Sequence, residues 1–307
     1  MAIAALPSGR QYEIRYGDQR ATVVEVGGGL REYVVGDRPV LDGYAESEMC
    51  DGARGQSLLP WPNRIKDGRY RWAGTDQQLP ITEVGKNTAI HGLARWLSWT
   101  ATEEAADRVT MACTVHPHPG YPFTLDLSIG YVLAADGLTV TTSATNASAD
   151  PCPYGAGAHP YLTVATEVID TAVVRIPGRT HLPVDERGIP TGRERVAGTA
   201  YDFMVARTIG ETEIDVAYTG LERDDDGLAR VVLQAPDGTV TVALWVDGHY
   251  PYLEIFTGDT LAPQRRRRGL GVEPMTCPPN AFATGEDVIS LAPGQTVVGR
   301  WGITPSG

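Results

Sequence analysis

Residues 123–133 read Phe-Thr-Leu-Asp-Leu-Ser-Ile-Gly-Tyr-Val-Leu, so apolar side chains alternate with polar or small ones. Successive side chains of a β-strand point to opposite faces, and this period of two predicts a strand with one buried face. Ala135-Asp136-Gly137 follows, and Leu138–Asn146 then alternates again. Because Asp-Gly between two alternating runs is typical of a hairpin turn, we expect the two runs to pair as antiparallel strands.

The same pattern extends outward along the chain. A second hairpin is predicted for Arg230–Ala235 and Thr239–Val246, around Pro236-Asp237-Gly238. Further strands are predicted at Tyr12–Tyr16, Ala21–Val26, Tyr252–Thr257, Gly269–Glu273 and Thr296–Ile303. No stretch of a dozen residues shows a helical period, and no linker divides the chain. We therefore predict an all-β fold: a single domain over residues 1–307, built as a large antiparallel β-sandwich with long loops.

Composition restricts the possible partners. The chain of 307 residues has 26 basic and 38 acidic residues and a net charge of −12, which argues against a nucleic-acid or anionic-membrane partner. Four widely spaced cysteines indicate reduced thiols rather than a disulfide framework or a metal site. Residues 1–9 lack the features of a signal peptide, and no apolar run approaches the ~20 residues of a membrane helix. We expect a soluble, cytoplasmic monomer or homodimer.

The stretch Gly271–Ala281 contains a candidate general base. Glu273 ends a short apolar run, and Pro274, Pro278 and Pro279 follow it. Proline has no N–H for a sheet ladder, so the chain is expected to leave the sheet directly after Glu273. A carboxylate held by a stiff loop suits a base that must keep its geometry, although a surface Glu before a turn is the commoner arrangement.

Five other polar groups occupy unusual settings. They are the amide and guanidinium of Trp61–Ile65, the histidine of Ala89–Leu93, the histidine of Gly157–Tyr161 and the acid within Ile214–Tyr218. Each one alone is more often a structural group that has found a hydrogen-bond partner. Together they supply one more carboxylate, one arginine and two histidines beside Glu273, with no set of three metal ligands.

These residues, in this order, resemble the aldose 1-epimerase (mutarotase) family. The matching motifs, over about Tyr12 to Ile303, are Asn63-Arg64-Ile65, Gly68-Arg69-Tyr70, His91-Gly92-Leu93, His159-Pro160-Tyr161, Asp215, Glu273-Pro274, Pro279-Asn280-Ala281 and Leu291-Ala292-Pro293-Gly294. The resemblance implies the family's β-supersandwich, a small-molecule sugar substrate, the interconversion of its α and β anomers, and no metal or other cofactor.

The resemblance also implies a role for each residue. Glu273 would take the proton of the anomeric hydroxyl, and His159 would protonate the ring oxygen as the ring opens. Arg64, His91 and Asp215 would hold ring hydroxyls. Asn63 and Tyr161 would lie close by.

Three other functions stay open at this point. A glycoside hydrolase normally uses two carboxylates, whereas the partner of Glu273 here is a histidine. A non-catalytic sugar-binding relative could keep the pocket, although the presence of both Glu273 and His159 argues against it. An isomerase of a specialised sugar pathway could reuse the same acid–base pair.

Arg95 sets this sequence apart from galactose-type members of the family. It lies within His91–Trp99, which contains two tryptophans where those members are richer in glycine. This version is similar to branches that act on sugars with an anionic group at C6, so the substrate is expected to be a free hexose or a C6-anionic hexose. Arg95 is then a substrate-binding candidate, with pairing to a surface acid as the alternative. A further hypothesis is that one of Arg265–Arg268 reaches the same rim of the pocket.

Overall fold

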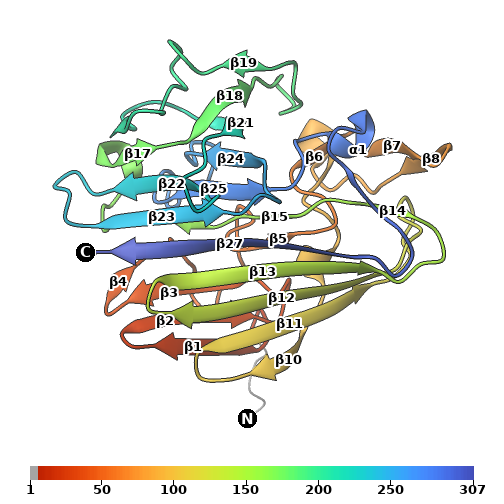
Figure 1. Cartoon of the computed structure of the whole chain (residues 1–307), viewed down its shortest axis with the longest axis horizontal. Helices are drawn as coiled ribbons and strands as arrows, with labels where there is room; N and C mark the ends of the chain where they lie inside the picture. The colour runs from red at the N-terminus through yellow and green to blue at the C-terminus, as the bar shows by residue number, and fades with distance from the viewer. Residues whose placement is uncertain (1–5) are drawn as a thin grey trace.

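The computed structural model describes residues 6–307, and two large antiparallel sheets dominate it (Figure 1). The first has nine strands in the spatial order β10 (Thr100–Glu104), β11 (Arg108–Val115), β12 (Leu125–Ala134), β13 (Gly137–Asn146), β27 (Thr296–Ser306), β23 (Thr241–Val246), β22 (Ala229–Gln234), β17 (Val173–Arg175) and β20 (Arg207–Thr208). The second has the order β19 (Glu194–Arg195), β18 (Gly178–Leu182), β21 (Asp215–Leu221), β24 (Tyr252–Phe256), β25 (Leu270–Met275), β15 (Gly157–Ala158) and β5 (Ser57–Leu58), with β16 (Tyr161–Leu162) also paired to β25.

Smaller elements surround these sheets. A four-stranded sheet contains β1 (Gln11–Tyr16), β2 (Gln19–Val24), β3 (Leu30–Val35) and β4 (Arg38–Pro39). Three pairs are β6 (Arg64–Lys66) with β9 (Thr88–Ile90), β7 (Arg69–Trp72) with β8 (Thr75–Gln78), and β14 (Cys152–Tyr154) with β26 (Ile289–Leu291). The helices described are short: η1 (Val84–Lys86), η2 (Ala94–Trp96), η3 (Ile169–Thr171) and α1 (Ala281–Thr284). Within residues 6–307 no helix has the length and apolar character needed to cross a bilayer.

The predicted hairpin forms the centre of the first sheet. β12 and β13 pair in continuous register from Leu125 opposite Asn146 to Ala134 opposite Gly137. The inward side chains of β12 are almost fully buried, Leu125 at 0% and Tyr131 at 1% exposure. The C-terminal strand β27 lies between β13 and β23, and so joins the two halves of this sheet (Figure 1). The prediction of an all-β, antiparallel supersandwich is confirmed.

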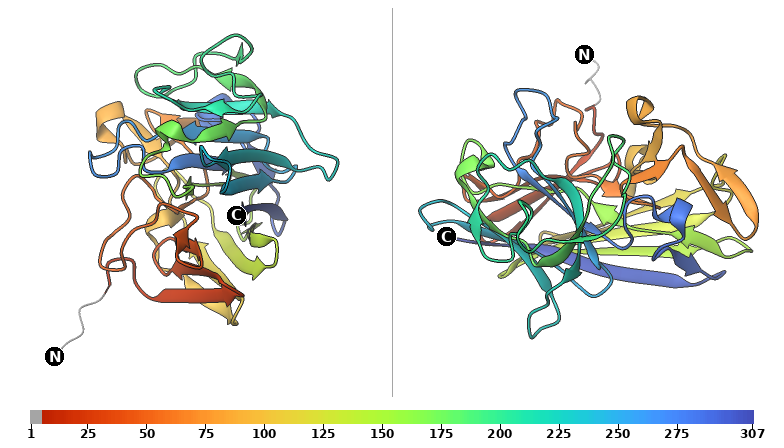
Figure 2. Two further views of the ribbon diagram at one scale, coloured as in Figure 1. Left: turned by 90° about the vertical axis from the view of Figure 1, so that its left-hand side faces the viewer. Right: turned by 90° about the horizontal axis from the view of Figure 1, so that it is seen from above.

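The second sheet has different surroundings on its two faces. Leu253 and Val272, from β24 and β25, belong to the large core that also contains inward residues of the first sheet. Tyr252 and Met275 point the other way, into a small separate apolar cluster. Since side chains alternate along a strand, Glu273 lies on the same face as Met275, away from the main core. In Figure 2, left, the green and teal strands of this sheet, β18 and β21, lie at the opposite end of the molecule from the red strands β1 and β2.

The prediction that the chain leaves the sheet after Glu273 is wrong. β25 continues through Pro274 to Met275, and Pro274 is paired in register with Leu253. Val272 and Thr276 donate their N–H groups to Pro160 and Ala156 on the other side of β25, so the nitrogen of Pro274 points to that side as well. The strand on that side of β25 is interrupted opposite Pro274, between β15 and β16. Pro274 therefore needs no N–H on that side, and the pairing of β25 with β24 stays intact.

Candidate active site

A cavity of about 480 Å³ lies over the outer face of β25, beside β6 and η2. Its lining includes all eight predicted site residues: Asn63, Arg64, His91, Arg95, His159, Tyr161, Asp215 and Glu273. These residues come from segments up to 210 positions apart in the chain (63 to 273), and only the fold brings them together.

His159 and Glu273 face each other at the interruption between β15 and β16. The backbone of His159 is held by two hydrogen bonds to the Gly55–Gln56 segment, and its Nε2 lies 3.1 Å from Oε1 of Glu273. The side chains are 6% and 3% exposed, so water barely reaches the pair. His159 Nδ1 and Glu273 Oε2 are buried without a hydrogen-bond partner. An acid–base pair with unmet polar atoms therefore faces the cavity.

Burial disfavours the charged form of both groups. It lowers the pKa of His159 to about 3, with the positive charge of Arg54 as the next cause. It also raises the pKa of Glu273 well above its ordinary value, and the nearby Glu254 carboxyl raises it further. Because burial favours the uncharged form of each group, the pair is expected to hold one proton between its two members, along the 3.1 Å contact.

Asn63 and His91 owe their positions to left-handed backbone. Asn63 has φ 50° and His91 has φ 63°, and the His91 N–H donates to the Asn63 carbonyl at 2.9 Å. Gly92 follows with φ 72°, and a Cβ there would lie 2.0 Å from the Leu59 carbonyl oxygen. Only glycine fits that close approach, which explains the His-Gly pair in the sequence. The His91 ring meets the His159 ring edge-on, with centroids 5.5 Å apart.

Arg64 is fixed by a partner that sequence reasoning missed. Its guanidinium donates to both oxygens of Glu83, at 2.8 and 3.0 Å, and Glu83 also accepts from the Thr88 hydroxyl. A bidentate pair of this kind holds the guanidinium plane at the cavity wall. No motif around Glu83 indicated this role, because the contact depends on the pairing of β6 with β9.

The ring of Tyr161 stacks on the ring of His159. The two rings are stacked, 4.9 Å apart and 16° from parallel, and the Tyr161 hydroxyl donates to the Gly52 carbonyl. On Tyr161 lies the guanidinium of Arg54, 4.3 Å from the ring centroid. Arg54 is 2% exposed and paired with Asp42 at 3.0 Å. No motif around Arg54 indicated this role.

Two further carboxyls lie near Glu273. Asp215 opens β21 and lines the cavity, and burial raises its pKa while the nearby Arg64 opposes that shift. Glu254 stands directly opposite Glu273 in the antiparallel ladder and is 3% exposed. Sequence reasoning missed Glu254, although an acid inside the run Tyr252–Thr257 was a usable signal.

Arg95 lines the cavity without a carboxylate partner. Among residues 6–307, no Asp or Glu oxygen lies within salt-bridge distance of it, and its Nε is buried without a hydrogen bond. Its guanidinium lies over the Trp96 ring, 5.1 Å from the centroid, and Trp96 and Lys86 line the same cavity. The alternative, in which Arg95 pairs with a surface acid, is therefore wrong for the described residues.

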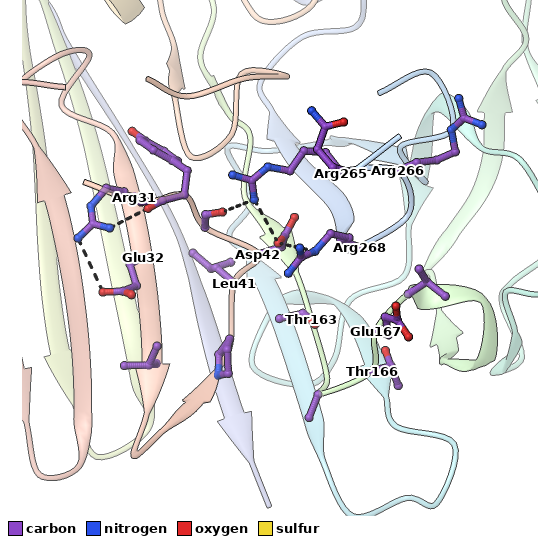
Figure 3. A pocket seen from close by; sticks show the side chains of 18 of the residues that line it. Arg31, Glu32, Leu41, Asp42, Thr163, Thr166, Glu167, Arg265, Arg266 and Arg268 are labelled. Atoms are coloured by element: carbon purple, nitrogen blue, oxygen red, sulfur yellow. Dashed lines mark hydrogen bonds and ion pairs between the residues drawn. The ribbon is translucent and has the colours of Figure 1, made fainter. Parts of the chain in front are cut away.

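The hypothesis that one of Arg265–Arg268 reaches this rim is wrong. Arg265, Arg266 and Arg268 line a different, larger cavity of about 820 Å³, where the first and last turn toward Asp42 (Figure 3). Arg267 is buried, with ion pairs to Asp170 and Asp259. Its left-handed backbone, φ 55°, directs it away from its neighbours.

Comparisons with known proteins agree with this fold. A family model described as aldose 1-epimerase matches residues 10–304, so the chain belongs to that family. Among individual relatives, the uncharacterized protein YihR of Escherichia coli (strain K12) is 35% identical over 94% of this chain and 91% of its own. The maltose epimerase of Levilactobacillus brevis is 27% identical over 85% of this chain and 80% of its own. The solved structure of the GalM/aldose epimerase homologue from C. elegans superimposes with a TM-score of 0.87 at 16% identity, covering 97% of this chain and 98% of that one.

Proposed function

We propose that the protein is a mutarotase that interconverts the α and β anomers of a free hexose by acid–base ring opening and closure. The observation that carries the proposal is the buried contact of 3.1 Å between His159 and Glu273 at the wall of the sugar-sized cavity. The reaction needs one proton acceptor and one proton donor around a ring, and this pair supplies both. Relatives named maltose epimerase and galactose mutarotase support the same reaction type.

The reaction begins with the shared proton on His159 and with Glu273 ionised. Glu273 takes the proton of the C1 hydroxyl, the oxygen lone pair forms the carbonyl bond, and the C1–O5 bond breaks. The electrons of that bond move to O5, which takes the proton from His159. Rotation about C1–C2 and reclosure on the other face, with both proton transfers reversed, gives the other anomer.

The remaining lining residues hold the ring while this happens. Arg64 is fixed by Glu83, and His91 by its backbone, so each presents a donor at a defined place. Asp215 can accept from a ring hydroxyl, and Asn63 and Tyr161 complete that wall. Positioning of this kind lowers the barrier because it removes the entropy cost of bringing the reacting groups together.

Arg95 favours a hexose that carries an anion at C6. In a protein of net charge −12, a buried guanidinium edge with no protein carboxylate is well placed for a ligand anion. Guanidinium matches the oxygens of phosphate or sulfonate in bidentate fashion, and Lys86 adds a second positive charge to the lining. We therefore propose that a 6-phospho or 6-sulfo hexose is preferred over glucose or galactose.

Polarimetry of freshly dissolved, pure α-anomers tests both parts. The protein should accelerate the approach to anomeric equilibrium, with kcat/KM higher for the C6-anionic hexose than for the neutral one. A glycoside of the same sugar, run in parallel, should remain intact, and its cleavage would point instead to a hydrolase. Binding without acceleration of any of these sugars would point to a sugar-binding relative without catalysis.

A further inference from the structure

Glu254 is a buried carboxyl group beside the proposed base. It stands opposite Glu273 in the ladder between β24 and β25, on the face that points away from the main core. Directly opposed residues of an antiparallel pair have Cβ atoms about 4.5–5.5 Å apart, so the two carboxyl groups can reach each other. On its other side Glu254 is paired with Ala217, and its Oε2 is buried without a hydrogen-bond partner.

The charged groups around Glu254 do not neutralise it. Two acids face it, Glu273 from β25 and Asp215 from β21. The nearby cations are Arg64, which is committed to Glu83 by two hydrogen bonds, and Lys86 at η1. No ion pair to Glu254 occurs in the described part of the chain. An ionised carboxylate in such a place would be buried, unpaired and next to two like charges, which is strongly unfavourable.

We propose that Glu254 is a positioning residue that stays protonated at neutral pH and donates its carboxyl O–H to Glu273. The inference rests on the proposed role of Glu273 as the base. A hydrogen bond from a neutral acid to a carboxylate is short and strong, and it would satisfy the oxygen of Glu273 that has no other partner. The apolar neighbours of Glu254, Tyr252 and Ala217, favour its uncharged form.

This bond would decide where the proton shared by His159 and Glu273 resides. Burial of that pair favours the neutral state, in which Glu273 is protonated. The proposed ring opening instead needs Glu273 ionised and His159 charged. Donation from Glu254 stabilises the carboxylate of Glu273 and so favours the proton on His159. Glu254 would thus prepare the base without lining the cavity or contacting the sugar.

The test compares the pH dependence of kcat/KM in Glu254→Gln and Glu254→Leu. The glutamine amide can still donate to Glu273, whereas leucine cannot. Loss of a hydrogen bond to a charged group should lower kcat/KM of Glu254→Leu about ten- to a hundredfold at neutral pH. The same loss raises the pKa of Glu273, so the acid limb of the profile should move up by about one to two pH units.

Glu254→Gln should restore most of that loss and return the acid limb close to its wild-type position. If Glu254 is instead ionised in the working enzyme, Glu254→Gln removes a like charge, and the limb moves to lower pH. That outcome would overturn the proposal, as would a limb that neither variant moves. The matched control is Glu32→Gln on β3, a partly buried carboxylate bonded to Arg20, which should leave the profile unchanged.

Infrared spectroscopy provides a readout that does not depend on turnover. The wild-type protein near neutral pH should show the carbonyl stretch of a protonated carboxylic acid, and Glu254→Gln should lose it. If the wild type epimerises no sugar, the proposed function fails while this band still reports on Glu254. If the sugar is epimerised but the band is absent or survives in Glu254→Gln, the function stands and the role of Glu254 is refuted.

Discussion

Two cavities of the described structure, of about 820 and 480 Å³, differ in how their charges are satisfied. In the larger one, three of the four lining arginines have protein partners: Arg31 donates to the Tyr44 carbonyl, Arg265 donates to the Gly43 carbonyl and to Glu48, and Arg268 pairs with Asp42. In the smaller one, four buried atoms have no partner among residues 6–307: Nδ1 of His91 and of His159, Nε of Arg95 and Oε2 of Glu273. Thr166 Oγ1 is the corresponding atom in the larger cavity.

Unmet buried polar groups, rather than size, are therefore the reason to propose the smaller cavity as the site. Leaving such a group unpaired costs about 1–3 kcal/mol, so a cluster of four around one cavity favours a ligand that completes them. In the larger cavity, Arg265 joins the loop before β25 to the segment after β4 through Gly43 and Glu48. Figure 3 shows Arg265 and Arg268 beside Asp42 of that segment. Variants of each cavity can test whether the two cavities divide function and stability in this way.

The largest effect is expected for Glu273→Gln. The amide fills the same space but cannot accept a proton, so kcat should fall by at least about 10²-fold. Because the replaced group is a buried carboxyl with an unpaired oxygen, the melting temperature should stay the same or rise. Polarimetry and thermal denaturation measure the two quantities. Turnover within a few-fold of wild type would remove Glu273 from the mechanism.

His159→Gln should also lower turnover strongly, while His91→Gln acts mainly on binding. Loss of the acid that protonates O5 should cost about 10²-fold in kcat with little change in sugar affinity. His91 is proposed to hold a hydroxyl, so its loss should raise KM by up to about tenfold. Steady-state polarimetry and calorimetric titration separate the effects. If both variants lose affinity and keep kcat, the acid has been misassigned.

The strands and several site residues could be predicted from the sequence, because a strand with one buried face has alternating apolar side chains. The alternation of residues 123–133 required one buried face, and β12 has it. His91 and His159 were recognisable because each sits beside glycine or proline in an apolar segment. Glu83 and Arg54 could not be predicted in this way, since each contacts a site residue only in the folded chain. The directions of the side chains of Arg265–Arg268 could not be predicted for the same reason. Arg267 is buried because it pairs with Asp170, which is 97 positions away in the sequence.

A smaller effect, limited to one class of substrate, is expected for Arg95→Ala. Removal of a charged hydrogen-bond donor should raise KM for a 6-phospho or 6-sulfo hexose about ten- to a hundredfold. Neutral hexoses should keep their kcat/KM within about threefold, because they make no ion pair. The measurement is kcat/KM for matched anionic and neutral sugars. An equal loss for both would mean that Arg95 shapes the cavity rather than selecting its ligand.

The smallest effect is expected for Arg265→Ala, the matched control in the larger cavity. The side chain of Arg265 is 16% exposed, and its main partner Glu48 is 54% exposed, so solvent screens the pair. Its loss should lower the free energy of unfolding by no more than about 1 kcal/mol. Turnover of anionic and neutral hexoses should both stay near wild type, because Arg265 does not line the smaller cavity. If Arg265→Ala instead lost the preference for the anionic sugar while Arg95→Ala kept it, the anion would be bound from the larger cavity. The arginines of the larger cavity would then bind the substrate despite their protein partners. Unpaired buried polar atoms would not, in that case, identify the substrate site in this fold.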